Sequence, residues 1–160
     1  MKNSDFFHNL KANRKLELVE PSQNITQGYL KKSSNCEIAA KVVHEAGVYE
    51  NAISEAYYSM YNIVMALFFS CGIKCENHIC SGLLLDAVFH LPKLSETILA
   101  FKKERIEKQY YIIQEDQELS KEECKKLLDT AQKFNAEIAA LIEKISNEDK
   151  KRIQLVIQKM

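Results

Sequence analysis

Apolar residues recur through most of the chain about every three or four positions, which is the period of an amphipathic helix. In residues 22–46 the apolar stripe alternates with lysines and glutamates, as in a helix with one buried and one exposed face. Ser22 is a residue type that caps helix starts, and Gly47 is a type that follows helix ends. Residues 22–46 are therefore predicted to form one long helix.

The stretch 56–73 contains no charged residue. Its length is near the lower bound for a membrane-spanning helix, about 18 residues. However, Tyr57, Tyr58 and Tyr61 lie inside the stretch, whereas membrane helices concentrate tyrosine at their ends. We therefore predict a helix over residues 49–71 that is buried on most sides, either at the centre of a bundle or in a dimer interface.

The same criteria predict the remaining elements. The clearest is a helix over residues 120–145, because Ser120 and Glu123 have the spacing of a capping box ahead of an apolar face. Asn147 is the predicted cap of the last helix. The other predicted helices span residues 4–18, 77–91 and 95–113, and an acidic loop is predicted over residues 114–119.

Composition supports one all-α domain. The chain has 160 residues, of which 46% are hydrophobic and 28% charged, so it should fold around a single core. Four glycines and two prolines are too few for the many turns of a β-sandwich or barrel. We expect an up-and-down bundle of about five to six helices within a single domain, residues 1–160. Its core spans residues 22–146, preceded by an N-terminal helix in 1–20 and followed by a basic C-terminal helix in 147–160.

The 22 basic and 22 acidic residues give a net charge of zero, so any site for a polyanion must be local. The start of the chain lacks the apolar core of a secretory signal, which predicts a cytoplasmic protein with reduced cysteines. No membrane association and no cofactor are expected.

A group of thiols and an imidazole follows the uncharged stretch: Cys71, Cys75, His78 and Cys80. These residue types are zinc ligands, but their spacing matches no common zinc motif, and cysteine is also a frequent core residue. We favour buried thiols and expect no metal site. The sequence also lacks the common hydrolase, zinc-protease, phosphate-loop and dinucleotide motifs.

Arg105 is the strongest candidate for a functional residue. Lys102 and Lys108 surround it, and Tyr110 and Tyr111 follow within two helical turns. Arginine beside aromatic side chains suits contacts with phosphates and bases. The alternative is a solvated helix face that carries no ligand.

Several motifs occur in a recognisable order. They are L-V-E-P-S at residues 18–22, A-I-S-E-A-Y-Y-S-M-Y at residues 52–61, G-I at residues 72–73 followed by His78, Arg105 followed by Tyr110, and Ser120 and Glu123 ahead of Ala131 and Phe134. This series resembles the HEPN superfamily, in particular its small stand-alone members paired with a minimal nucleotidyltransferase. The resemblance covers roughly residues 16–145.

The resemblance implies a helical bundle that forms a homodimer. Active members are metal-independent ribonucleases of toxin–antitoxin and defence systems, in which the arginine of an R-x4-6-H motif holds the RNA phosphate and the histidine moves protons. Arg105 matches that arginine, but residues 110–112 are Tyr, Tyr and Ile. Gln109, Glu55 and Asn62 also differ from the family's residues at their positions. Arg105, Tyr110 and His78 are therefore the candidate catalytic residues.

In related toxin pairs the nucleotidyltransferase adenylylates a tyrosine beside this motif. By that resemblance Tyr110 and Tyr111 are candidate acceptors, with Lys102 and Lys108 as candidate nucleotide-binding residues. We expect a partner in a nucleotidyltransferase or toxin–antitoxin-type system that binds RNA or cleaves it weakly. The alternative is a catalytically silent dimer that binds a partner protein or a nucleotide.

Overall fold

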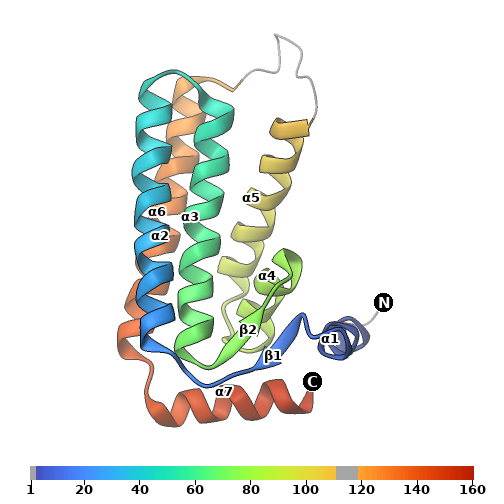
Figure 1. The fold of residues 1–160 in the computed structure, drawn as a ribbon. Helices are drawn as coiled ribbons and strands as arrows, with labels where there is room; N and C mark the ends of the chain where they lie inside the picture. Colours follow the sequence, from blue (N-terminus) through green and yellow to red (C-terminus); the bar gives the residue numbers. More distant parts are fainter. Residues whose placement is uncertain (1–2, 111–118) are drawn as a thin grey trace.

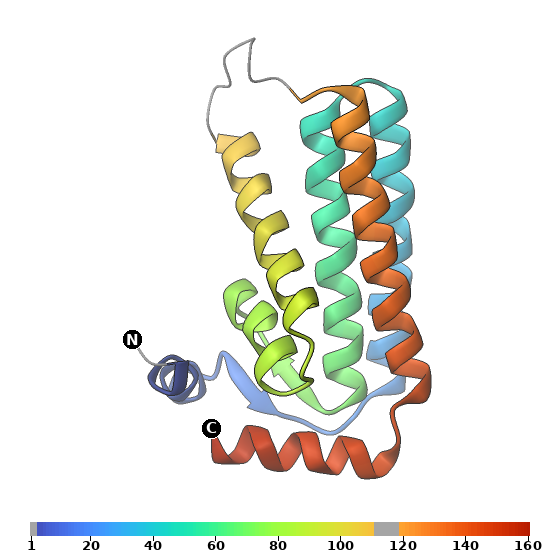
Figure 2. The same cartoon turned by 180° about the vertical axis from the view of Figure 1, so that it is seen from behind.

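Four helices run side by side in the computed structural model, which describes residues 3–110 and 119–160 (Figure 1). They are α2 (Gln23–Glu45), α3 (Tyr49–Ser70), α5 (Pro92–Tyr110) and α6 (Lys121–Lys144). α3 is central, because it packs against each of the other three. Seen from behind, α5 lies on one side of α3, and α2 and α6 lie on the other (Figure 2). The prediction of an all-α bundle is confirmed.

Three shorter helices complete the described part of the chain: α1 (Asn3–Ala12), α4 (His78–Ala87) and α7 (Asn147–Lys159). α4 packs against α5, and α7 crosses the base of the bundle (Figure 1). The described residues thus contain seven helices, more than the five to six expected. The chain's two ends lie beside each other at the base, where the Lys11 ammonium group donates a hydrogen bond to the Ile157 carbonyl.

Most helix ends follow the predicted capping residues. The Ser22 hydroxyl accepts a hydrogen bond from the Ile25 N–H, and Ser120 and Glu123 form the full capping box. Gly47 follows α2 with φ of +80°, a conformation that glycine adopts without strain. The prediction for α7 was displaced by one residue, because Ser146 and not Asn147 caps it, in a capping box with Asp149.

The N-terminal helix expected over residues 4–18 was too long. α1 ends at Ala12, and Arg14 adopts a left-handed φ of +57° that turns the chain. Residues 16–18 instead form strand β1 (Leu16–Leu18), which pairs antiparallel with β2 (Ile73–Cys75). Sequence patterns missed this pair because three residues are too few to display a strand period.

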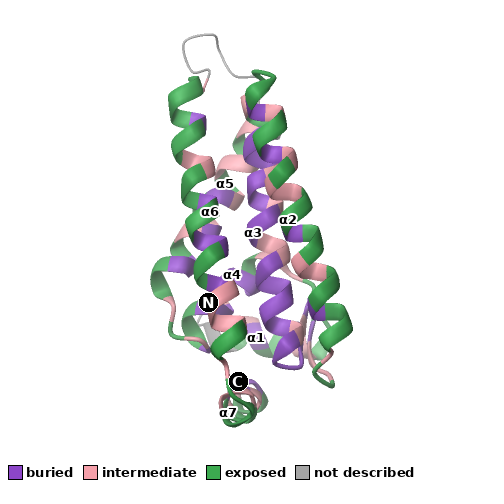
Figure 3. Cartoon of the chain, turned by 90° about the vertical axis from the view of Figure 1, so that its left-hand side faces the viewer, coloured by how far each residue is buried: buried purple, intermediate pink, exposed green. Residues whose placement is uncertain are grey.

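The core is built around α3. Its uncharged residues are buried on nearly every side, as expected, and the ribbon of α3 is largely buried where that of α2 is largely exposed (Figure 3). The most deeply buried side chains of α3 include Tyr57, Met60, Leu67 and Phe68. α3 therefore presents side chains to α2, α5 and α6 at once, and this packing positions the site described next.

No helix within the described residues is long and apolar enough to cross a membrane.

Candidate functional site

Five polar and aromatic side chains meet where α3, α4 and α5 converge. We call them the tyrosine–histidine cluster: Tyr57, Tyr58, Tyr61, His78 and Arg105. The three tyrosines lie on α3 within one helical turn. His78 is the first residue of α4, where the Asn77 side chain caps the helix by accepting hydrogen bonds from the Ile79 and Cys80 N–H groups.

His78 is held by two tyrosines. Its Nδ1 atom lies 2.6 Å from the Tyr57 hydroxyl oxygen, so the two groups share a hydrogen bond. Its ring stacks on Tyr61 with 4.0 Å between ring centroids and 17° between the ring planes. One ring nitrogen is thereby engaged, which leaves Nε2 as the atom available for an outside partner.

Arg105 approaches Tyr57 and Tyr58 from α5. Its Nη1 group donates a hydrogen bond of 2.6 Å to the Tyr58 hydroxyl. The guanidinium carbon lies 5.2 Å from the Tyr57 ring centroid and 5.3 Å from that of Tyr58, within the range of cation–π contacts. The Nε atom is buried, with no hydrogen-bond partner among the described residues. Arg105 is thus oriented by the two rings, while part of its hydrogen-bonding capacity is unused.

Burial shifts the pKa values of the cluster. It lowers the pKa of His78 below its usual 6.5, and the charges of Arg105 and Lys102 lower it further. Burial also raises the pKa of the Tyr57 hydroxyl, partly offset by Arg105, and raises that of Tyr61 to about 12. Near neutral pH these shifts favour a neutral imidazole at His78 and protonated hydroxyls at Tyr57 and Tyr61.

This shift of the His78 pKa predicts a pH dependence of stability. Because the folded protein disfavours the His78 cation, the unfolded chain takes up that proton first, and the free energy of unfolding falls as the pH drops through the usual histidine pKa of 6.5. We expect His78→Gln to remove this part of the pH dependence in urea titrations. The other histidines are common to both proteins and cancel in the comparison, so parallel curves would contradict the lowered pKa.

The other predicted site residues lie elsewhere on α5 or outside the described residues. Lys102 and Lys108 are half-buried on α5, and the charge of Lys102 reaches His78. Tyr110 is the last residue of α5, and its side chain, like all of Tyr111, is outside the described residues. The acceptor role of these tyrosines therefore stays a prediction.

The thiols predicted to be buried lie at the end of α3, in β2 and in α4. Cys71, Cys75 and Cys80 are buried and free. A hydrogen bond from Cys80 lowers the pKa of Cys75 to about 7. Within the described residues, no group of three or more His, Cys, Asp or Glu side chains is arranged to hold a metal ion.

Sequence reasoning identified Arg105 and His78 but not what joins them. Tyr57, Tyr58 and Tyr61 were interpreted as core residues of a buried helix, and the structure adds their contacts with the two candidates. The available signal was their concentration within a single turn of the uncharged stretch 56–73. Hydroxyl groups in such a helix need polar partners, since burying them unpaired is costly.

Comparison with known families gives one match. A family model described as "HEPN domain" matches residues 26–145, which is most of the chain and includes the whole tyrosine–histidine cluster. A search of curated proteins finds no match.

Proposed function

Because the chain belongs to the HEPN domain family, we propose that it binds RNA at the tyrosine–histidine cluster and cleaves it weakly without a metal ion. At the level of the family, membership suggests a role as a nuclease or in a toxin–antitoxin-type system. The proposal extends this to a homodimer that acts with a nucleotidyltransferase partner. The observation that carries it is the contact of Arg105 and His78 with the same residue, Tyr57.

Arg105 is suited to a phosphate. Its guanidinium lies against two tyrosine rings, so little side-chain freedom remains to be lost on binding. The Tyr58 hydroxyl occupies one donor at Nη1, and the remaining N–H groups include those that can bind phosphate oxygens. Lys102, one turn earlier on α5, adds a second positive charge near His78.

His78 supplies a proton acceptor that the end of α5 lacks. A neutral imidazole can take the proton of a ribose 2′-hydroxyl at Nε2. The 2′-oxygen then bonds to phosphorus as the bond from phosphorus to the 5′-oxygen breaks, and the leaving 5′-oxygen takes a proton from water. Arg105 stabilises the added negative charge. This role of Nε2 requires the tautomer with its proton on Nδ1, in which Nδ1–H donates the hydrogen bond to the Tyr57 hydroxyl oxygen.

The test is RNA binding by Arg105→Ala. We expect it to weaken binding of single-stranded RNA by about 1 to 3 kcal/mol and to flatten the dependence of affinity on salt, because one phosphate contact is lost. Lys103→Ala is the matched control, since Lys103 is an exposed cation on α5 that pairs with Glu107. Fluorescence anisotropy across a salt series measures both variants.

Cleavage separates the role of His78 from that of Arg105. We expect His78→Gln to retain RNA binding and to lose cleavage in a chelator-containing buffer. If Arg105→Ala and Lys103→Ala bind RNA equally well, the cluster is not the RNA site and the proposal fails.

One observation favours a second candidate, a catalytically silent interaction module. Tyr57 and His78 bond to each other, as do Tyr58 and Arg105, so much of the cluster is satisfied without a ligand. Such a cluster can serve to hold α4 and α5 in place for a partner protein. This candidate predicts unchanged RNA binding in Arg105→Ala together with a lower fraction of dimer in sedimentation at micromolar concentration.

A further inference from the structure

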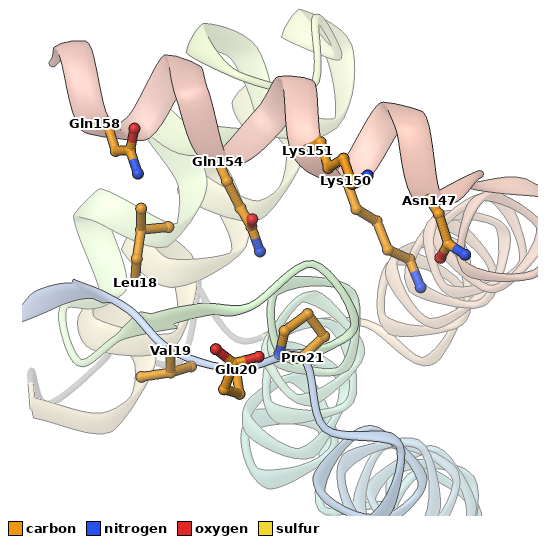
Figure 4. A pocket seen from close by; sticks show the side chains of 9 residues that line it. All are labelled: Leu18, Val19, Glu20, Pro21, Asn147, Lys150, Lys151, Gln154 and Gln158. Carbon is orange, nitrogen blue, oxygen red and sulfur yellow. The ribbon is translucent and has the colours of Figure 1, made fainter.

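A pocket of about 560 Å³ lies at the base of the bundle, away from the tyrosine–histidine cluster. One wall is the segment of residues 18–21 that joins β1 to α2, and the other wall is α7 (Figure 4). Its volume is within the range of small-molecule sites. None of the proposals above uses it.

The α7 wall is polar and basic. Gln154 and Gln158 lie one turn apart and extend toward the opposite wall, and Lys150 reaches toward Pro21 (Figure 4). Lys151 adds a second cation to the lining. Among the described residues neither lysine forms an ion pair, in contrast to Arg152 on the same helix, which pairs with Asp149.

The opposite wall adds an acceptor and an apolar surface. The Glu20 carboxylate points across the pocket toward α7, and Leu18 points toward Gln158 (Figure 4). The Gln154 amide nitrogen donates to the Cys71 carbonyl at 2.9 Å, which fixes this side chain and leaves its oxygen as an acceptor. The lining contains no aromatic side chain, so it offers no surface on which a nucleobase would stack.

We propose that this pocket binds a small sugar phosphate, with the phosphate at Lys150 and Lys151 and the sugar hydroxyls at Glu20, Gln154 and Gln158. Two unpaired lysines attract a dianion, and charge-assisted hydrogen bonds to phosphate are strong. The Glu20 carboxylate repels a second anionic group but can accept hydrogen bonds from hydroxyl groups. It therefore favours a ligand with one charged end and one neutral, hydroxyl-bearing end. The proposal does not rest on RNA binding at the cluster.

Calorimetric titration of the full chain with ribose-5-phosphate tests the proposal. We expect binding at micromolar to millimolar concentration, weaker binding of inorganic phosphate, and no measurable binding of ribose. Lys150→Ala should weaken the binding about tenfold or more, since a charge-assisted contact to phosphate is removed. Lys159→Ala, which removes an exposed cation from the same helix outside the pocket, should leave it unchanged.

Lys150→Gln keeps a long polar side chain without the charge. It should show the same loss of ribose-5-phosphate affinity, and it serves as the control in case the alanine variant misfolds. Each of the following results overturns the proposal: no binding of ribose-5-phosphate by the unmodified chain, equal binding of ribose-5-phosphate and inorganic phosphate, or equal affinity in the Lys150 and Lys159 variants. Displacement of ribose-5-phosphate by short single-stranded RNA that binds more tightly would also overturn it, because the pocket would then be part of an RNA surface.

Discussion

Gly72→Ala is expected to destabilise the protein by roughly 2 to 4 kcal/mol. Gly72 follows α3 with φ of +75°, a left-handed conformation that strains a residue with a side chain. A Cβ atom at this position would also collide with the Val19 backbone oxygen, and it would lie 2.7 Å from the Gln154 amide nitrogen. The close approach exists because the Val19 N–H donates to the Gly72 carbonyl at 2.9 Å.

Gly47→Ala is the matched control. Gly47 has a similar φ of +80°, but nothing lies within 4 Å of an added Cβ. It should therefore cost only the conformational strain, about 1 kcal/mol. Urea unfolding of the two variants measures the difference, and equal losses would show that the contact between residues 19 and 72 is looser than the structure indicates.

Phe68→Ala is expected to cost about 3 to 5 kcal/mol of the free energy of unfolding. The Phe68 side chain is fully buried on α3 and stacks on Phe89 with 5.6 Å between centroids and 12° between the ring planes. Its removal leaves a cavity between α3 and the α4–α5 connection, and the rigid neighbouring helices cannot collapse to fill it.

Leu155→Ala provides the comparison for Phe68→Ala. Leu155 lies on α7 and is 53% exposed, so truncating it should change stability by no more than about 0.5 kcal/mol. Thermal or urea denaturation of both variants is the measurement. A loss below about 1 kcal/mol for Phe68→Ala would contradict the burial of this ring in the core.

Local sequence signals predicted the helices because the physics of helix ends is local. Ser22 and Ser120 each bond to a backbone N–H three residues later, so residue types within one turn define the start of the helix. Gly47 marks an end for the same reason, since its backbone conformation depends on its own lack of a side chain. The error at α7 was a displacement of the cap by one residue. Ser146 and Asn147 are both capping types, and only the capping-box partner Asp149 distinguishes them.

The pairing of β1 with β2 depended on tertiary structure. Leu16 and Cys75 are register partners, yet they are far apart in the chain, and each strand has only three residues. Such short strands are stable through their neighbours: Leu16 is buried in the core, and Lys74 pairs with Glu17. No window of sequence contains both halves of this arrangement.

The sequence by itself determined that the chain is helical, that residues 49–71 form a helix buried on most sides and that Arg105 and His78 are candidates, because periodicity, charge and residue type are readable position by position. Tertiary structure decided how the candidates meet. Arg105 lies on α5 and His78 on α4, and both reach Tyr57 only because α3 packs against these elements. The pKa of His78 then follows from burial and from charges that α5 brings near it, which are properties of the packed molecule and not of any segment alone.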